Sequence, residues 1–265
     1  MSPPRDNKRL AVTANLRSLI GSGRTVIAPG ASDALSARLI EAHGFECVYI
    51  GSYATAASRR GLPDTGLLSL EELASHARTI AAAVRVPVIA DAESFENSVP
   101  LFEAAGVAAI HIEDHTGAGK HTDAPQQLHP VERAAERIRA AVAARTNPEF
   151  LIVARSDAFW VHRDLDDCIR RLERYAQAGA DMVFPTMVGP SELAELRRRI
   201  SKPIMIVNNA DEEHSGAAIV LYYAFSVARQ FEALRRALAD GKLASDTGAL
   251  EEFLGYKDAP GRSRR

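Results

Sequence analysis

A helix-to-strand joint that occurs three times is the feature that most constrains the fold of this chain. In each joint a helical pattern ends at a glycine, and a run of apolar, β-branched residues follows within three residues, around Gly44, Gly106 and Gly179. A glycine just past a helix end can adopt the left-handed conformation and satisfy the last carbonyls, so a strand can begin at once. Repeated joints of this kind predict parallel strands connected by helices.

Eight short apolar runs are predicted to be strands of a sheet that is covered on both faces. They lack the alternation of apolar and polar residues that is typical of a sheet with one solvent-exposed face. Helical patterns separate them; in one, Leu73, Ala77 and Ile80 fall on the same face. Eight strands that alternate with helices favour an α/β fold of the closed (β/α)8 TIM barrel type, and no GxGxxG or P-loop string supports a doubly wound nucleotide fold. The predicted strands are 25–29, 47–51, 87–92, 108–113, 150–155, 181–185, 203–207 and 218–223.

The length of 265 residues suits one barrel domain, so we predict a single domain over 1–265. Residues 226–256 are predicted to form an additional C-terminal helical region, and residues 257–265 a flexible tail. Apolar positions on helices beyond a complete barrel need a surface to pack against. We therefore expect a homo-oligomer, a dimer or a tetramer, in which this helical region is exchanged between subunits.

Composition excludes several classes of partner. Lys and Arg number 32 against 34 Asp and Glu, so the chain lacks the basic field that nucleic-acid binding needs. No stretch approaches the ~20 apolar residues of a membrane span, and no apolar segment follows the first charges, so we expect no membrane contact and a cytoplasmic protein.

The two cysteines, Cys47 and Cys168, are too few for a disulfide framework and are predicted to be buried packing residues.

Charged residues end three neighbouring predicted strands. Asp91 and Glu93 end the third, Glu113 ends the fourth, and Arg155 ends the fifth. The carboxyl ends of barrel strands form the active-site face. Carboxylates that converge there need a cation, and oxygen ligands favour Mg²⁺, or Mn²⁺, over zinc. Taken alone, the acidic residues could equally cap helices and Arg155 could be a structural ion-pair partner, although its planar fork suits a substrate carboxylate.

Several motifs together resemble the isocitrate lyase/phosphoenolpyruvate mutase superfamily. They are the stretch from IAPGASDALSARLIEAHGF to SLEELASHARTI at 27–80, and the strings PVIADAE, FEAAGVAAIHIED and FLIVARSDA, in the order and spacing of that family. The resemblance covers residues 26–187 well and the remainder weakly, with FLGY again similar to the end of its smaller members. It implies a TIM barrel that acts on a small carboxylate substrate with Mg²⁺.

The resemblance also implies roles for individual residues. Asp91 and Glu93 match an acidic pair that holds Mg²⁺ directly or through water, and Glu113 matches a third acidic position near the metal. Asp64 matches an acidic residue close to the active site. The residues that match the family's binding site for the substrate carboxylate are Arg155, Gly51, Ser52 and Tyr53. Further substrate contacts are predicted at Asn208 and Asn209.

The loop HTGAGKHTDAPQQLH, residues 115–129, lies where the family keeps its mobile gating loop. A loop of this length can close over a substrate and exclude water, which predicts catalytic roles for Lys120, His121 and Thr122. Members that split isocitrate or methylisocitrate carry a cysteine here in a Lys-x-Cys-Gly-His string, whereas this chain has Thr122. A hydroxyl is too weak an acid to replace a tuned thiol, so we do not expect those two activities.

The predicted function is therefore a Mg²⁺-dependent lyase of the phosphoenolpyruvate mutase-like branch. It would act at the bond to C3 of an oxaloacetate- or phosphonopyruvate-like 2-oxo acid, through an enolpyruvate intermediate. Departures from the family pattern leave alternatives open: Glu93 is longer than the usual Asp, SFENS replaces a Gly-rich stretch, and Gly51 precedes Ser52 in reversed order. The alternatives are a carbon–carbon lyase on a substituted malate or a biosynthetic 2-oxo acid, and a non-catalytic carboxylate-binding homologue.

Overall fold

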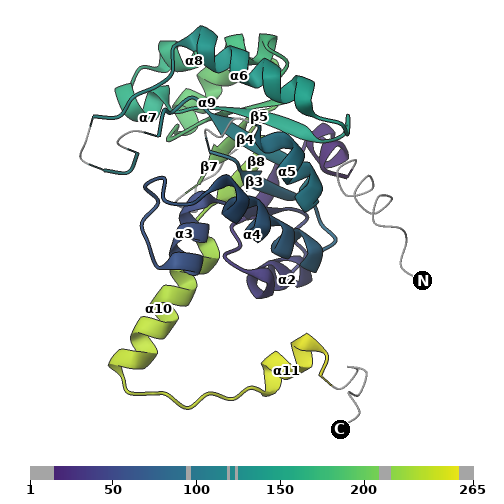
Figure 1. Cartoon of the computed structure of the whole chain (residues 1–265), viewed down its shortest axis with the longest axis vertical. Coiled ribbons are helices and arrows are strands. Elements are labelled where there is room, and N and C mark those ends of the chain that lie inside the picture. Colours follow the sequence, from purple (N-terminus) through teal and green to yellow (C-terminus); the bar gives the residue numbers. More distant parts are fainter. Residues whose placement is uncertain (1–14, 94–96, 118–119, 123–124, 209–215, 257–265) are drawn as a thin grey trace. The chain divides into compact units, whose positions relative to one another are not determined.

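The computed structural model describes residues 15–93, 97–117, 120–122, 125–208 and 216–256. It contains eight short parallel strands with helices around them (Figure 1). The strands are β1 Val26–Pro29, β2 Val48–Ile50, β3 Val88–Asp91, β4 Ala109–Glu113, β5 Leu151–Ser156, β6 Met182–Pro185, β7 Met205–Val207 and β8 Ile219–Tyr222. Each lies within a predicted run or exceeds it by one residue, so the eight-strand prediction is confirmed.

The strands close into a barrel. Five of them pair in the order β2-β3-β4-β5-β6 and three in the order β1-β8-β7, all parallel. Isolated parallel bridges join the two groups, between Gly30 and Tyr49 on one side and between Val183 and Ile204 on the other. Gly30 permits this closure because a Cβ there would lie 2.3 Å from the backbone oxygen of Tyr223. The (β/α)8 barrel prediction is confirmed.

Helices follow the strands and cover the outside of the barrel (Figure 1). They are α2 Ala34–Ala42, α3 Ser52–Arg60, α4 Leu70–Ala83, α5 Ser98–Ala105, α6 Val131–Ala144, α7 Ala158–His162, α8 Leu165–Gln177 and α9 Pro190–Arg199, followed by α10 Phe225–Ala239 and α11 Gly248–Leu254. The glycines of the predicted joints, Gly44, Gly106 and Gly179, all have a positive φ. Left-handed glycines therefore end these helices, as the sequence pattern predicts.

Two apolar cores follow from the alternation of side chains along each strand. Residues such as Val48, Ile50 and Ile110 point outward and pack against the helices. Residues such as Ile89 and Leu151 point inward and fill the barrel. Because the inward residues pack the interior, the free space for a ligand lies at the end of the strands rather than along the axis.

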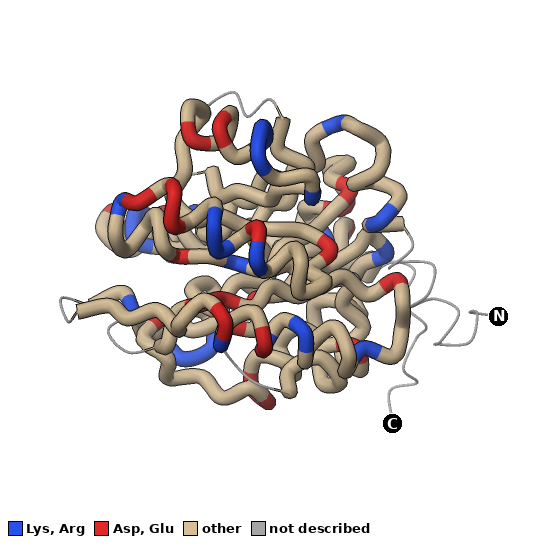
Figure 2. The backbone as a smooth tube through the Cα atoms, turned by 90° about the horizontal axis from the view of Figure 1, so that it is seen from above, with Lys and Arg blue, Asp and Glu red and all other residues tan. Residues whose placement is uncertain are grey.

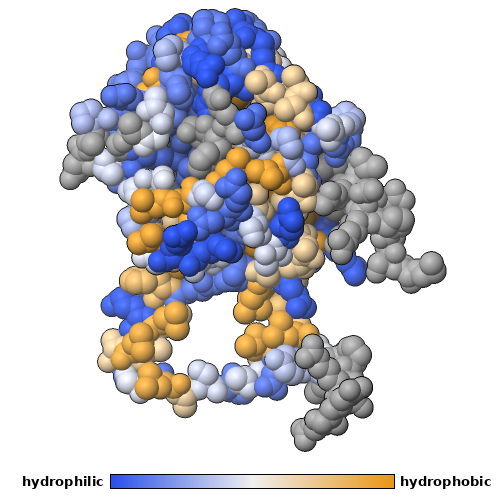
Figure 3. All heavy atoms as spheres, viewed as in Figure 1, coloured by the Kyte–Doolittle hydropathy of each residue, from blue (hydrophilic) through white to orange (hydrophobic). Residues whose placement is uncertain are grey.

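The contacts divide the chain into two units, Met1–Val227 and Ala228–Arg265. The first holds the barrel, and charged residues of both signs are interspersed over its outer segments (Figure 2). The second begins within α10, on which apolar side chains gather (Figure 3). Three of them, Phe231, Leu234 and Leu238, are each more than 60% exposed. Within the described part of the chain, no helix is both long and apolar enough to cross a membrane.

Candidate functional site

Strand alternation decides which rim residues face the barrel interior. Ile89, Ala109 and Val153 belong to the inner core, so the positions two or four residues further along also point inward. These positions hold Asp91, Glu113 and Arg155. The strand register places them side by side: Asp91 pairs with His111, Glu113 with Arg155, and Arg155 with Phe184.

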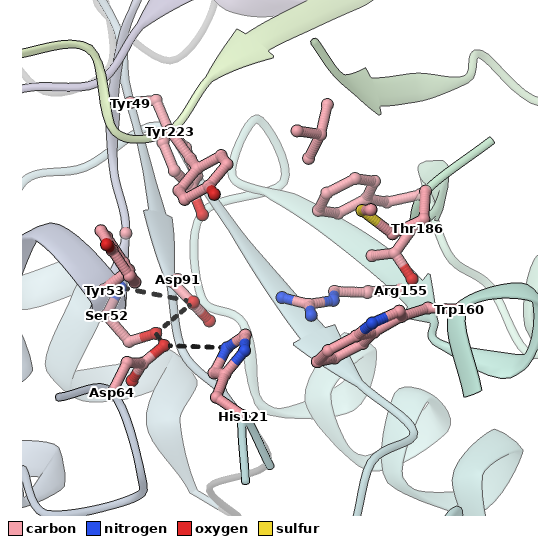
Figure 4. Close-up of a pocket in the computed structure, with 14 residues that line it drawn as sticks. Tyr49, Ser52, Tyr53, Asp64, Asp91, His121, Arg155, Trp160, Thr186 and Tyr223 are labelled. Carbon is pink, nitrogen blue, oxygen red and sulfur yellow. Dashed lines mark hydrogen bonds and ion pairs between the residues drawn. The ribbon is translucent and has the colours of Figure 1, made fainter. Parts of the chain in front are cut away.

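A cavity of about 300 Å³ opens at this end of the barrel, within the lower range of small-molecule sites. Figure 4 shows its lining side chains, which come from the ends of several strands and from the segments that follow them. They are Tyr49, Gly51, Ser52, Tyr53, Asp64, Asp91, His121, Arg155, Trp160, Phe184, Thr186, Met187, Val207 and Tyr223. Nine of these residues have a polar or charged side chain or a phenol hydroxyl, so the cavity suits a small polar molecule.

Ser52 links two carboxylates on one side of the cavity. Its Oγ lies 2.9 Å from Asp91 Oδ2 and 3.0 Å from Asp64 Oδ2, and its backbone N–H donates to Asp91 Oδ2 at 3.4 Å (Figure 4). The residue stands at the first position of α3, where free N–H groups and the helix dipole favour negative charge. Because one hydroxyl proton serves two buried carboxylates, this corner has an excess of negative charge.

Lys120 lies among the other acidic residues of the rim. Its Nζ is 2.9 Å from Glu113 Oε1 and 3.9 Å from Glu93 Oε1, and all three side chains are buried. Although burial opposes the charged amine, the carboxylate of Glu113, with Asp91 and Glu93, raises the pKa of Lys120 above its ordinary value. Burial raises the pKa of Glu93 to about 8. The ammonium group of Lys120 therefore stays charged and partly neutralises these carboxylates.

Arg155 is held in one orientation by two carboxylates. Its Nε and one terminal nitrogen donate to Asp157 at 2.7 and 3.1 Å, and the other terminal nitrogen lies 3.1 Å from Glu113 Oε2. The guanidinium carbon also lies 5.5 Å from the centre of the Phe184 ring. A fixed guanidinium in the wall of the cavity is suited to a carboxylate ligand.

A second layer beneath the cavity orients Asp91. His111 Nδ1 lies 3.5 Å from Asp91 Oδ1, and its Nε2 lies 2.9 Å from the hydroxyl of Tyr49. Burial lowers the pKa of His111 to about 4, so this ring is neutral at neutral pH. Asp91 Oδ1 also accepts the backbone N–H of Glu93 at 2.7 Å. These contacts direct the carboxylate of Asp91 toward Ser52.

His121 spans the mouth of the cavity. Its Nε2 lies 3.4 Å from Asp64 Oδ2, and its ring centre lies 5.1 Å from that of Trp160 in α7 (Figure 4). The backbone of His121 has a φ of 55°. The residue therefore connects the segment after β4 with the segments after β2 and β5.

The remaining predicted contacts have different positions. Gly51 and Tyr53 line the cavity. Asn208 is buried and donates from Nδ2 to the hydroxyl of Tyr222 at 2.9 Å, and it is not among the residues that line the cavity. Thr122 is exposed and likewise stands outside the lining, whereas Asn209 lies outside the described residues.

The residues at the rim fit a hard divalent cation in chemistry and in charge. In the described part of this rim the carboxylates are Asp64, Asp91, Glu93, Glu113 and Asp157, and the cations are Lys120 and Arg155. Even with Glu93 protonated, as its raised pKa implies at neutral pH, four carboxylates against two cations leave an excess of negative charge among oxygen-only donors, the set that Mg²⁺ prefers. No three His, Cys, Asp or Glu side chains of the described residues form a metal cluster by themselves. Mg²⁺ commonly needs only one or two carboxylates because it keeps several waters.

Sequence reasoning missed the apolar part of the lining, namely Trp160, Phe184, Met187, Val207 and Tyr223. Phe184 and Val207 stand in predicted strands, and Tyr223 ends one. The rule that the carboxyl ends of strands line the site would have identified these three, had it been applied to apolar as well as polar residues. Trp160 carries no such signal, because it belongs to a five-residue helix directly after β5.

Comparisons with known proteins agree with this geometry. A family model described as phosphoenolpyruvate phosphomutase matches residues 16–240. The 2,3-dimethylmalate lyase of Eubacterium barkeri is 35% identical over 237 residues, which cover 81% of this chain and 80% of that protein. A crystal structure of phosphoenolpyruvate phosphomutase from Streptomyces platensis subsp. rosaceus has a TM-score of 0.84 and 30% identity, over 92% of this chain and 96% of that one.

A structure of phosphonopyruvate hydrolase in complex with oxalate and Mg²⁺ has a TM-score of 0.79 at 27% identity, over 92% of this chain and 95% of that one. Alignments with six isocitrate or 2-methylisocitrate lyases cover 54–64% of the length of those proteins. The resemblance and the fold predicted from the motifs are both confirmed.

Proposed function

This chain belongs to the phosphoenolpyruvate phosphomutase family, and from that premise we propose that it is a Mg²⁺-dependent lyase. Its reaction would break the bond to C3 of a small 2-oxo acid of the oxaloacetate or phosphonopyruvate type, through enolpyruvate. Oxaloacetate would release CO2, and phosphonopyruvate would transfer its phosphoryl group to water. The observation that supports this most is the set of buried carboxylates Asp91, Glu93 and Glu113 beside Arg155 at the mouth of the barrel.

The carboxylate of the substrate is assigned to Arg155 and to the start of α3. Arg155 is oriented by Asp157 before any ligand arrives, so little entropy is lost when the ligand binds. Gly51 and Ser52 border the same space at the start of α3, where the helix dipole favours negative charge. These groups would fix the acid in one orientation and leave its C3 toward the rest of the cavity.

Asp91 and Glu93 would hold the cation, directly or through water, with Glu113 close by. When bound, Mg²⁺ supplies a Lewis acid that stabilises the negative charge developing on the 2-oxo group. Asp91 is prepared for this role by Ser52 and by the backbone of Glu93. Lys120 neutralises part of the cluster.

Formation of pyruvate requires a proton at C3 of the enolate. His121 lines the cavity and lies 3.4 Å from Asp64, which can orient its ring, so we assign the delivery of this proton to His121. Both cysteines of the chain are buried, and burial raises the pKa of each thiol to about 12. The chemistry therefore depends on no thiol of this chain, in accord with the absence of a loop cysteine.

A steady-state assay of pyruvate formation tests the proposal. We expect the full chain to release pyruvate from oxaloacetate or phosphonopyruvate with Mg²⁺, and EDTA to abolish the reaction. Asp91→Asn should lower kcat/KM by about a hundredfold or more, since it removes a charged group at the cation site. Asp166→Asn changes a carboxylate that is 90% exposed and should leave the rate unchanged. Turnover that survives EDTA, or no turnover of any 2-oxo diacid, would contradict the proposal.

A second candidate is a carbon–carbon lyase that acts on a substituted malate. It is favoured by the 35% identity with a 2,3-dimethylmalate lyase over most of both chains. The same Arg155 and carboxylate cluster would serve, because such an acid also presents a carboxylate beside a C2 oxygen. A screen of alkyl malates for 2-oxo acid products separates this candidate from the first.

A further inference from the structure

The two sides of the cavity differ in chemistry. One side is polar, with Ser52, Asp64, Asp91 and His121 (Figure 4). The other side is formed mainly by apolar and aromatic side chains from the ends of β6, β7 and β8 and from α7, namely Phe184, Met187, Val207, Tyr223 and Trp160. Thr186 also lines this side, but its hydroxyl donates to Asp157 at 2.8 Å. A ligand that fills the cavity must therefore be polar at one end and apolar at the other.

We propose that this apolar side is a subsite for an alkyl substituent at C3 of the substrate, so that the protein prefers C3-substituted acids over unsubstituted ones. The inference rests on the proposed function, because that function assigns the carboxylate to Arg155 and the start of α3, and the C2 oxygen to the cation at Asp91 and Glu93. It adds which class of 2-oxo or 2-hydroxy acid the site selects.

Strand register brings the subsite next to the carboxylate position. Phe184 pairs with Arg155 between β5 and β6, and both side chains point into the barrel. The Phe184 ring contacts the Arg155 guanidinium on one side and packs edge-on against His111 at 5.3 Å. When the carboxylate of an acid binds Arg155, the third carbon of that acid therefore lies beside Phe184 and the other apolar side chains.

Charge gives the second argument. Among the described residues that line the cavity, Arg155 is the single guanidinium or ammonium group, and it already contacts Asp157 and Glu113. An anionic group placed against Phe184, Met187 and Val207 would lose its water without gaining a cation, so the anionic group that leaves C3 would lie away from this wall. An alkyl group in the same place loses no hydrogen bond and gains from leaving water.

Val207 offers the cleanest test of the subsite. It is half-buried, it stands at the end of β7 and it lines the cavity. Val207→Thr keeps the shape of the side chain and replaces one methyl group by a hydroxyl. Val86→Thr makes the same change at a half-buried position that precedes β3 and is not among the lining residues, so it is the matched control.

The experiment is calorimetric titration of the full chain, with Mg²⁺ present, by oxalate and by pyruvate, 2-oxobutyrate and 2-oxo-3-methylbutyrate. The three 2-oxo acids share a carboxylate and an oxo group and differ only in the alkyl carbons beyond C2. Each added carbon should tighten binding by about fourfold, the gain from burying one methylene group. Val207→Thr should reduce this gain below about twofold per carbon, whereas Val86→Thr should retain it.

Affinities that stay level or fall along the series while oxalate binds would overturn the apolar subsite and leave the proposed function standing. If Val207→Thr retained the fourfold gain in affinity per added carbon, the assignment of the subsite to this wall would also be overturned. If oxalate itself fails to bind in the presence of Mg²⁺, the proposed function fails, and the subsite fails with it.

Discussion

Glu93 combines several features that are unfavourable for a single residue. Its φ is 48°, a conformation that costs about 1–3 kcal/mol for a residue with a side chain. Its carboxyl group is buried beside other carboxylates, and burial raises its pKa to about 8. His121 and Met187, which line the cavity, also have a positive φ. Such strain persists where the surrounding structure imposes it, and its concentration here agrees with a functional role for the cavity.

At the residue scale, strand alternation separates Glu113 from its neighbour Asp114. Glu113 points inward to Arg155, whereas Asp114 accepts hydrogen bonds from Ser156 and from Tyr175, both at 2.9 Å. Asp114 is thus a structural residue between β4 and α8. The contact of Lys120 with Glu113 could not have been predicted in this way, because it depends on the conformation of a loop and not on a periodic pattern.

At the element scale, helix α4 shows how local sequence determines a boundary. Ser69 accepts the backbone N–H of Glu72 at 3.3 Å, and Glu72 accepts the backbone N–H of Ser69 at 2.9 Å. This capping box satisfies two N–H groups that the helix leaves free. The inward face holds Leu73, Ala77 and Ile80, as the helical spacing predicts.

Ser69→Ala should lower the free energy of unfolding by about 1 kcal/mol, because it removes the side-chain acceptor at the helix start. Urea unfolding followed by far-UV circular dichroism measures this loss. Ser75→Ala makes the same change at an exposed position within the same helix and should be neutral or slightly stabilising, since Ala favours helix interiors. Equal losses in the two variants would show that the cap does not stabilise the helix.

The eight strands were predictable because buried parallel strands are continuous apolar runs between recognisable helix ends. The short helix α7 was not, since five residues are too few for a helical period to show. Its Trp160 lines the cavity and contacts His121, so a site residue was missed together with the element that carries it. Where function depends on short segments between the regular elements, periodic patterns give no information.

At the scale of the whole molecule, α10 presents an apolar face that the single chain leaves exposed. Phe231, Leu234 and Leu238 are spaced three and four residues apart and are 65%, 64% and 67% exposed. Burial of such side chains is worth about 1.5–3 kcal/mol each. We therefore keep the proposal that residues 226–256 pack against a second subunit in a homo-oligomer.

Analytical ultracentrifugation tests this proposal. We expect the full chain to sediment as a dimer or tetramer, and the pair Leu234→Asp and Leu238→Asp to shift it toward the monomer, because charges cannot be buried in an apolar contact. Ala233→Asp places one such charge on a different face of α10 and should preserve the oligomer. A monomeric parent chain, or variants that sediment like the parent, would contradict the proposal.

The central claim is that Arg155 and the acidic rim together bind a divalent cation and a carboxylate. Calorimetric titration of the full chain with oxalate, in Mg²⁺ and then in EDTA, tests it most directly. We predict that oxalate binding weakens by at least about tenfold without the metal. We also predict that it weakens by about tenfold or more in Arg155→Lys, because lysine keeps the positive charge but lacks the planar guanidinium that binds a carboxylate through two nitrogen atoms. Equal affinity in Mg²⁺ and EDTA, or unchanged affinity in Arg155→Lys, would contradict the claim.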